Sequence, residues 1–374
     1  MRTGAIHELN ALGQSVWLDS ISRSLIKTGR LQSLIDLGLS GLTSNPTIFD
    51  HAVASGPDYD DQVRGLRQRG AATFEIYDEL TVTDVRDAAD LFRPVHERTG
   101  GRDGYVSLEI DPRLADDARR TVDEGLRLFR KVDRPNVMFK VPATEAGYGA
   151  VEELTAAGVN VNITLIFSTR QYHETAQAYL RGLKRLIAAK GDPRRVRSVA
   201  SVFVSRIDTA VDRELDALIA KESDPRRREF ARAVKGRVAV ANTHLCYAIF
   251  RRIFGGDEFR DLAARGAAPQ RPLWGSTSTK NPDYSDIKYV QELIAKDTVN
   301  TMPEKTFLAF IDHGRVVEAL TAETAGSQKI LDDLASLGVS VQAVCARLLE
   351  DGVQAFDRSL DDLLRTIEKK AGTL

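Results

Sequence analysis

Short apolar segments alternate with longer amphipathic segments along most of the chain. The apolar segments, which we interpret as strands, are Ser15–Asp19, Gly41–Ser44, Tyr105–Glu109, Val137–Val141, Val159–Phe167, Val199–Val204 and Pro272–Gly275, with a weaker eighth at Val299–Thr301. Apolar residues at three- and four-residue spacing predict helices over Ala115–Lys131, Glu145–Ala157, Arg170–Ala189 and Ile207–Ala220. This alternation indicates parallel βαβ units, which build either a closed barrel or an open doubly wound sheet.

Polar residues near the ends of the strands favour the barrel. They are Asp19, Thr43, Asn45, Glu109, Lys140, Asn162, Thr164, Ser201 and Ser276. A barrel brings all its strand ends to one mouth, whereas an open sheet concentrates function at one switch point. An open nucleotide-binding sheet also carries a glycine-rich phosphate loop, and Gly100-Gly101 has no GxGxxG continuation. We therefore predict an α/β fold, a (β/α)8 TIM barrel.

The segment Val161–Leu165 illustrates the expected arrangement. Alternate side chains of a strand face opposite sides, so Asn162 and Thr164 share one face and Val161, Ile163 and Leu165 share the other. A strand inside βαβ repeats is covered on both faces. We expect the polar face to line the barrel interior and the apolar face to pack on the outer helices.

Three segments exceed what a simple barrel needs. We expect two helices within Asp50–Gly104, an extended crossover over Ser223–Gly256, and one long amphipathic helix over Ser340–Ala371 that packs on the barrel or on another subunit. No linker or low-complexity run interrupts the chain. The prediction is a single elaborated barrel domain over residues 1–374, with the barrel at about 13–320, extra helices in its crossovers, and a helical C-terminal extension at about 321–374.

Composition narrows the functional classes. Fifty-two Lys and Arg nearly cancel fifty-three Asp and Glu, so no basic excess points to nucleic acid. Cys246 and Cys345 are the only cysteines, which argues for a reducing compartment over a disulfide scaffold. The N-terminal segment Met1–Asn10 lacks an apolar leader, the apolar runs are too short to cross a membrane, and the six histidines form no metal-binding pattern. We expect a soluble cytoplasmic protein without a metal.

Lys140 is the first candidate for chemistry. It lies within the apolar run Val-Met-Phe-Lys-Val-Pro, which has no neighbouring carboxylate in sequence. Desolvation favours the neutral amine of a lysine, the form that attacks a ketone or aldehyde to give a Schiff base. The alternative is a lysine whose ammonium reaches solvent at the strand end.

Asp19 and Glu109 end two similar segments, Val-Trp-Leu-Asp and Val-Ser-Leu-Glu, so both should face the same mouth as Lys140. Schiff-base chemistry needs proton shuttles, and two carboxylates in different environments can serve. The alternative is that the two acids cap helices or pair with nearby cations.

Two segments offer groups that suit a phosphate. Arg206 follows a strand at the start of a helix, where backbone N–H groups favour anions. The segment Gly275-Ser-Thr-Ser-Thr-Lys280 combines hydroxyl donors, among them Ser276, with one cation, although such Ser/Thr clusters are more often plain turns.

With these residues in hand, the chain resembles the transaldolases, from about Gly13 to Thr306. The motifs that carry the resemblance are Val16-Trp-Leu-Asp19, Gly41-Leu-Thr-Ser-Asn-Pro-Thr-Ile-Phe49, Val106-Ser-Leu-Glu109, Met138-Phe-Lys-Val-Pro142, Asn160-Val-Asn-Ile-Thr-Leu-Ile-Phe167 and Ser201-Val-Phe-Val-Ser-Arg206. The tail, including Asn300-Thr-Met-Pro-Glu-Lys305, is similar to the longer bacterial branch of that family.

The resemblance implies a class I Schiff-base mechanism without a cofactor. Lys140 matches the lysine nucleophile, Glu109 the acid that activates a water for the proton steps, and Asp19 the acid/base at the sugar C4 hydroxyl. The implied substrate-binding residues are Thr43, Asn45, Asn162, Thr164, Ser201, Phe203, Arg206, Ser276 and Lys280. Many relatives carry an arginine in the last loop, where this chain offers Lys280, slightly displaced.

The function implied is reversible transfer of a dihydroxyacetone unit from sedoheptulose 7-phosphate to glyceraldehyde 3-phosphate, in the non-oxidative pentose phosphate pathway. One alternative is an aldolase of the same mechanism that releases dihydroxyacetone, although such relatives are typically shorter barrels. A catalytically inactive sugar-phosphate-binding barrel is another, and it would be expected to lack Lys140, Glu109 or Asp19. A purely structural role would not require polar residues at successive strand ends. Oligomeric state, monomer or homodimer, is left open.

Overall fold

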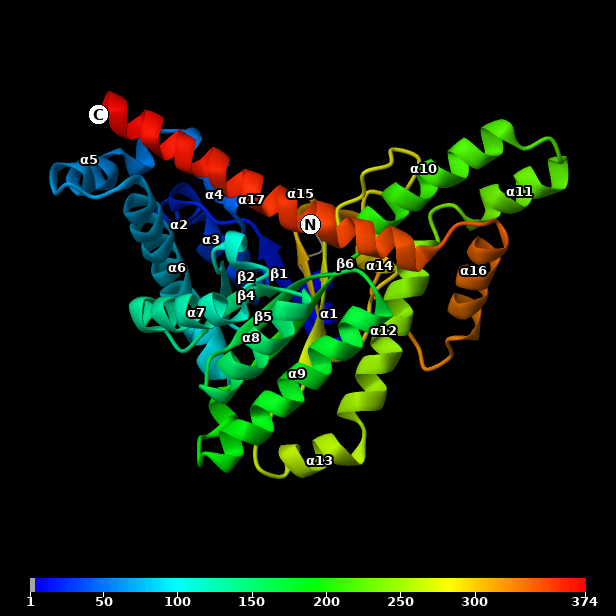
Figure 1. Cartoon of the computed structure of the whole chain (residues 1–374), viewed down its shortest axis with the longest axis horizontal. Coiled ribbons are helices and arrows are strands. Elements are labelled where there is room, and N and C mark those ends of the chain that lie inside the picture. The colour runs from blue at the N-terminus through cyan, green and yellow to red at the C-terminus, as the bar shows by residue number, and fades with distance from the viewer. Residues whose placement is uncertain (1–3) are drawn as a thin grey trace.

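The computed structural model describes residues 4–374, and eight parallel strands in it close into a barrel. The first three residues of the N-terminal segment considered above lie outside the described part. The strands are β1 (Gln14–Asp19), β2 (Gly41–Thr43), β3 (Tyr105–Glu109), β4 (Val137–Pro142), β5 (Val161–Ile166), β6 (Ser198–Phe203), β7 (Gln270–Gly275) and β8 (Thr298–Met302). Each strand pairs with the next along the chain, and β8 pairs with β1. The predicted (β/α)8 barrel is confirmed (Figure 1).

All the predicted strands are present, with ends that shift by a few residues. The weak eighth segment is a full strand, because its backbone pairs with both β7 and β1. The predicted helix Ala115–Lys131 begins later, at Ala118, because Asp117 caps it with a side-chain hydrogen bond from the Arg120 N–H.

Helices cover the outside of the barrel and fill its crossovers (Figure 1). They are α1 (Gly4–Leu12), α2 (Arg23–Lys27), α3 (Arg30–Asp36), α4 (Pro46–Ala54), α5 (Asp60–Gln68), α6 (Thr73–Arg98), α7 (Ala118–Val132), α8 (Glu145–Ala156), α9 (Thr169–Ala188), α10 (Ser205–Lys221), α11 (Pro225–Val234), α12 (Val238–Phe254), α13 (Asp257–Ala263), α14 (Lys288–Gln291), α15 (Glu304–His313), α16 (Ala325–Ser336) and α17 (Val341–Thr373). Short 3-10 turns occupy Pro57–Tyr59, Pro112–Leu114 and Pro193–Arg195. The two helices expected in the long second crossover are α5 and α6, and the extended sixth crossover holds α11, α12 and α13.

Strand β5 departs from the expected alternation at its end. Leu165 has a φ of 58°, and the register with β6 shifts between Ile163 and Ile166. The side chain of Leu165 lies against Gly352 of α17, so this residue packs beneath the C-terminal helix and not simply with Val161 and Ile163 on the outer helices. Leu165 is buried in the same apolar cluster as Val161 and Ile163, as expected, and its contact with α17 is an addition that strand periodicity does not encode, because it depends on a bulge.

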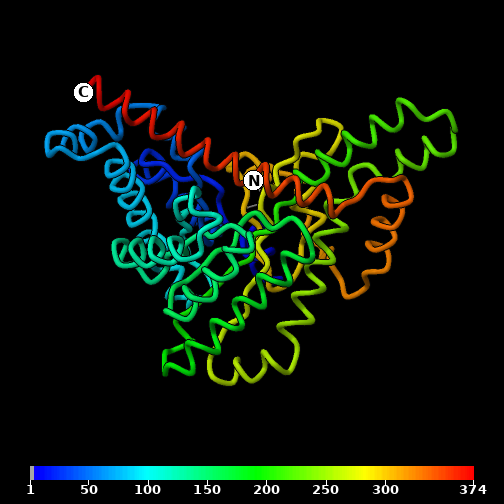
Figure 2. The backbone as a smooth tube through the Cα atoms, in the orientation of Figure 1, coloured from blue at the N-terminus to red at the C-terminus, as the bar shows by residue number. Residues whose placement is uncertain are grey.

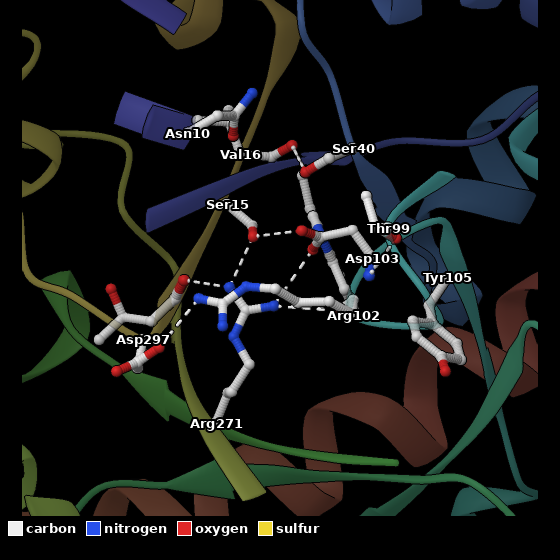
Figure 3. A network of polar contacts seen from close by, with 12 residues as sticks. Asn10, Ser15, Val16, Ser40, Thr99, Arg102, Asp103, Tyr105, Arg271 and Asp297 are labelled. Atoms are coloured by element: carbon white, nitrogen blue, oxygen red, sulfur yellow. Dashed lines mark hydrogen bonds and ion pairs between the residues drawn. The ribbon is translucent and has the colours of Figure 1, made fainter. Parts of the chain in front are cut away.

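Buried polar groups fill the N-terminal end of the barrel. Arg271 of β7 and Asp103, which precedes β3, form an ion pair at 3.2 Å. Ser15 of β1 donates to Asp103 at 2.7 Å and accepts from Arg271 at 2.5 Å (Figure 3). These contacts connect β1 and β7 to the segment that precedes β3, at the end opposite the predicted site.

The helix α17 runs along the opposite, C-terminal end of the barrel (Figures 1 and 2). It contacts α10 on one side of the mouth and α4 and α5 on the other. Its buried stripe includes Val344, Phe356, Leu360, Leu363 and Ile367. The long amphipathic helix is thus confirmed, and of the two packing alternatives it adopts the one on its own barrel.

Candidate active site

A cavity of about 210 Å³ lies among the C-terminal ends of the strands. Its lining residues are Asp19, Thr43, Asn45, Lys140, Thr164, Ser201, Phe203, Arg206, Leu273, Gly275, Ser276, Ser278, Lys280, Thr301, Pro303 and Phe356. All the predicted site residues except Glu109 and Asn162 line this cavity. Those two side chains lie directly behind residues that do.

Lys140 is buried, and it contacts an acid from the neighbouring strand. Its Nζ lies 2.6 Å from Oε2 of Glu109 and donates to the Ser44 carbonyl oxygen at 2.9 Å. The two side chains are only 6% and 4% exposed. Strand register produces the contact, because Glu109 is opposite Lys140 in the β3–β4 pairing. The carboxylate missing from the local sequence of Lys140 is therefore supplied by the fold.

Burial raises the pKa of the Glu109 carboxyl above its ordinary value of 4.5, and the nearby Lys140 opposes that shift. A carboxyl with a raised pKa accepts a proton more readily than an ordinary one and can return it. Glu109 is thus placed to exchange protons with the lysine amine.

Asp19 occupies the end of β1 and is held by hydroxyl groups. Thr43 of β2 donates to Oδ1 of Asp19 at 2.8 Å, and Thr301 of β8 lies 2.7 Å from the Thr43 hydroxyl. Burial raises the pKa of the Asp19 carboxyl, while the Thr43 hydrogen bond and the positive charge of Lys140 lower it. The two acids thus have different partners, a cation for Glu109 and a hydroxyl for Asp19.

A chain of polar groups crosses the barrel interior beneath the cavity. The Ser201 hydroxyl donates to Oδ1 of Asn162 at 2.6 Å, and Nδ2 of Asn162 donates to the Ser107 hydroxyl at 3.0 Å. Asn162 therefore positions Ser201 from behind the wall. Thr164 differs, because its buried hydroxyl lines the cavity and has no hydrogen-bond partner among the residues that the structure describes. A bound hydroxyl or water would satisfy it.

Asn45 lies at the start of α4, next to the cavity. Its side-chain oxygen accepts from the Ile48 N–H at 3.0 Å, and Pro46 occupies the first helical position. Since the cap uses the oxygen, the amide NH2 is the group that can meet a ligand.

Cationic and hydroxyl groups gather on the opposite wall of the cavity. Arg206, in the first turn of α10, places its guanidinium 5.3 Å from the ring centre of Phe203. Burial lowers the pKa of Arg206. Ser276, with a φ of 52°, lies after β7, and Lys280 donates to the Ser278 hydroxyl at 2.9 Å. This wall can receive an anion through one arginine, one lysine and two hydroxyls.

Six of the lining residues were not among the predicted site residues, and three of these, Ser278, Thr301 and Phe356, add a hydroxyl or an aromatic ring to the cavity. Ser278 lies in the Ser-Thr-Ser-Thr segment already noted, and Thr301 ends the strand that was weakest in sequence. Phe356 comes from α17, more than 200 residues from Lys140 along the chain. The amphipathic stripe indicated that Phe356 is buried, but no local pattern could say against what.

The surrounding structure contains neither a metal cluster nor a membrane segment within residues 4–374. Across that range no group of three or more His, Cys, Asp or Glu side chains could hold a metal ion. No helix there combines the length and apolarity needed to cross a bilayer.

Comparison with known proteins agrees with this geometry. A family model described as Transaldolase/Fructose-6-phosphate aldolase matches residues 16–367. A transaldolase of Saccharopolyspora erythraea is 46% identical over 367 residues, 98% of this chain and 97% of the relative. A transaldolase of Thiobacillus denitrificans is 46% identical over 361 residues, 96% and 98% of the two chains. A protein named Transaldolase 2 of a Nostoc species is 41% identical over 371 residues, 98% and 97%. The chain therefore belongs to the transaldolase/fructose-6-phosphate aldolase family.

Proposed function

We propose that this chain, a transaldolase by its family and its full-length relatives, uses Lys140 as its Schiff-base nucleophile. The observation that carries the assignment is the buried contact of 2.6 Å between Lys140 Nζ and Glu109 Oε2 at the wall of a polar cavity. Proton transfer to Glu109 frees the amine electron pair for attack on a ketose carbonyl. Glu109 then serves the proton steps that turn the carbinolamine into the Schiff base, directly or through a water.

Asp19 is the proposed base for carbon–carbon cleavage. It removes the proton of the sugar C4 hydroxyl, the C3–C4 bond breaks, and the electron pair moves into the lysine imine, leaving a dihydroxyacetone enamine on Lys140. The raised pKa of Asp19 suits it to take this proton and to return it when an acceptor aldehyde is added. The imine is the electron sink, so the mechanism needs no cofactor.

The polar walls fit a phosphorylated sugar. Asn45, Thr164 and Ser201 offer hydrogen bonds to sugar hydroxyls, and Arg206 with Lys280 offers charge to the phosphate. We propose sedoheptulose 7-phosphate as donor and glyceraldehyde 3-phosphate as acceptor, which give erythrose 4-phosphate and fructose 6-phosphate. The protein would act in the cytoplasm, in the pentose phosphate pathway, as a single barrel domain that is monomeric or homodimeric.

Borohydride trapping tests the nucleophile. Reduction in the presence of fructose 6-phosphate, followed by peptide mass spectrometry, should give one adduct on Lys140. An adduct elsewhere, or none while activity persists, refutes the mechanism. The Lys140→Ala variant should keep its far-ultraviolet circular dichroism and lose turnover.

An acceptor-dependence assay tests transfer. Fructose 6-phosphate should be consumed rapidly only when erythrose 4-phosphate is present. Equally fast consumption without an acceptor would indicate an aldolase that releases dihydroxyacetone.

A further inference from the structure

One residue that lines the cavity, Phe356, belongs to the C-terminal helix α17 and not to a strand or to the segment after a strand. Phe356 of α17 is 7% exposed, lines the cavity, and places its ring centre 5.5 Å from Lys140 Nζ. The other lining residues belong to β strands or to the segments directly after them. The side chain that α17 presents to Lys140 is therefore an apolar ring, which can neither donate a proton nor hydrogen-bond a water as a hydroxyl would.

Contacts on both sides of Phe356 hold its helix in place. Gly352 lies so close to Leu165 that a Cβ there would be 2.9 Å from Leu165 Cδ2. In the other direction, the Thr47 hydroxyl of α4 donates to the Ser359 hydroxyl at 2.8 Å. The backbone within one turn of Phe356 is thus tied to β5 and to α4, the two elements that flank this part of the mouth.

A larger hollow lies beside the same part of α17. A groove of about 710 Å³ lies between α17 and the first turns of α8 and α9, and Val353 and Asp357 line it. These residues are the neighbours of Phe356 on the same helix. Among the residues that the structure describes, none lines both the groove and the cavity. Removing the ring would take away part of the cavity wall on the helix whose neighbouring residues line this larger groove.

Access of solvent to Lys140 would affect the fate of the proposed enamine. Once C3–C4 is broken, the three-carbon enamine has two fates. Its C3 can attack an acceptor aldehyde, which is transfer. Alternatively C3 takes a proton from solvent, a water oxygen adds to C2, and the C2–N bond breaks, so that one water is consumed and dihydroxyacetone and the free amine are released. Only the second fate requires solvent to reach the enamine before an acceptor does.

We infer that Phe356 is a specificity-determining residue that favours transfer over release, by shielding the enamine on Lys140 from solvent. The inference rests on the proposed role of Lys140 as nucleophile. It assigns to the C-terminal helix a part in choosing between the two activities that give the family its name.

The partition ratio tests this role. Release is measured as dihydroxyacetone formed from fructose 6-phosphate without an acceptor, and transfer as the reaction with erythrose 4-phosphate. Both are expressed per active site titrated by borohydride trapping on Lys140. Phe356→Ala should raise the ratio of release to transfer by about ten-fold or more, with Phe356→Leu between it and the wild type.

Ile367→Ala is the matched control. Ile367 is fully buried on the same helix but does not line the cavity, so its truncation weakens helix packing without opening the wall. The control ratio should equal that of the wild type. The inference fails if Phe356→Ala and Phe356→Leu keep the wild-type ratio, or if Ile367→Ala raises the ratio equally. Absence of a Lys140 adduct in the wild type would instead refute the proposed function. If Phe356→Ala does not fold, the ratio of release to transfer in Phe356→Leu tests the inference alone: a raised ratio supports it, and the wild-type ratio refutes it.

Discussion

The network at the N-terminal end of the barrel gives a prediction about stability that is separate from catalysis (Figure 3). Asp103 accepts hydrogen bonds from Ser15 at 2.7 Å, from the Trp17 indole at 3.3 Å and from Arg271 at 3.2 Å. The charged side chains of Arg271 and Asp103 are 8% and 10% exposed. Arg271 also donates to the Thr298 carbonyl oxygen at 2.6 Å, so it bridges β7 and β8.

Asp103→Ala removes the two carboxylate oxygens that accept these three hydrogen bonds, and it leaves the Arg271 charge buried without its counterion. Breaking a buried pair by removing one partner costs about 3–5 kcal/mol. Since Arg271 keeps its bonds to backbone carbonyl oxygens, we expect a loss near the lower end, about 3 kcal/mol. Adding Arg271→Met removes the stranded charge and fills similar space, so the double variant should recover about half of that loss.

Urea unfolding followed by circular dichroism, with the slope compared between variants, measures the effect. Turnover per active site should not change, because the network lies at the end of the barrel opposite Lys140. A loss below about 1 kcal/mol for Asp103→Ala would refute the reasoning, because it would mean that the pair contributes no more than an exposed one. A double variant no more stable than Asp103→Ala would refute the part assigned to the stranded charge.

Three further changes test the site and its surroundings. Glu109→Gln keeps the side-chain size but removes the acid, so kcat should fall about 100-fold or more, and a near-normal kcat would contradict its role in proton transfer. Arg206→Ala should raise the KM for phosphorylated substrates about ten-fold or more, with a smaller change in kcat; an unchanged KM would remove Arg206 from the phosphate site. Burial raises the pKa of Asp208 from 3.8 to about 6. Between about pH 4 and pH 6, Asp208 therefore keeps its proton in the folded protein but loses it in the unfolded chain. As a result, the stability contributed by Asp208 falls as the pH rises through this range. Compared with Asp208→Asn, the wild type should lose about 3 kcal/mol of unfolding free energy over that range, and a pH-independent difference between the two would contradict the shift.

The local patterns of the sequence were sufficient for much of the fold and the site. Parallel strands that are buried on both faces appear in the sequence as short apolar runs. A polar residue at the C-terminal end of such a run is therefore expected at the mouth of a barrel. This is why Asp19, Lys140 and Ser201 could each be assigned from its own segment. The contact between Leu165 and α17 could not, because it joins a bulge in β5 to a helix that lies far away along the chain.

Strand and helix periodicity are local properties, and they were enough to identify most of the strand-end side chains that reach the mouth of the barrel, although not Ser278, Thr301 or Phe356. The contacts that each of these side chains makes at the mouth depend on how the whole chain folds. Strand register placed Glu109 beside Lys140, and the docking of α17 placed Phe356 over the same amine. Both contacts join segments that lie far apart along the chain, so no local pattern encodes them. An amphipathic stripe specifies that a face must be buried, but only the closed barrel supplies the surface that buries it.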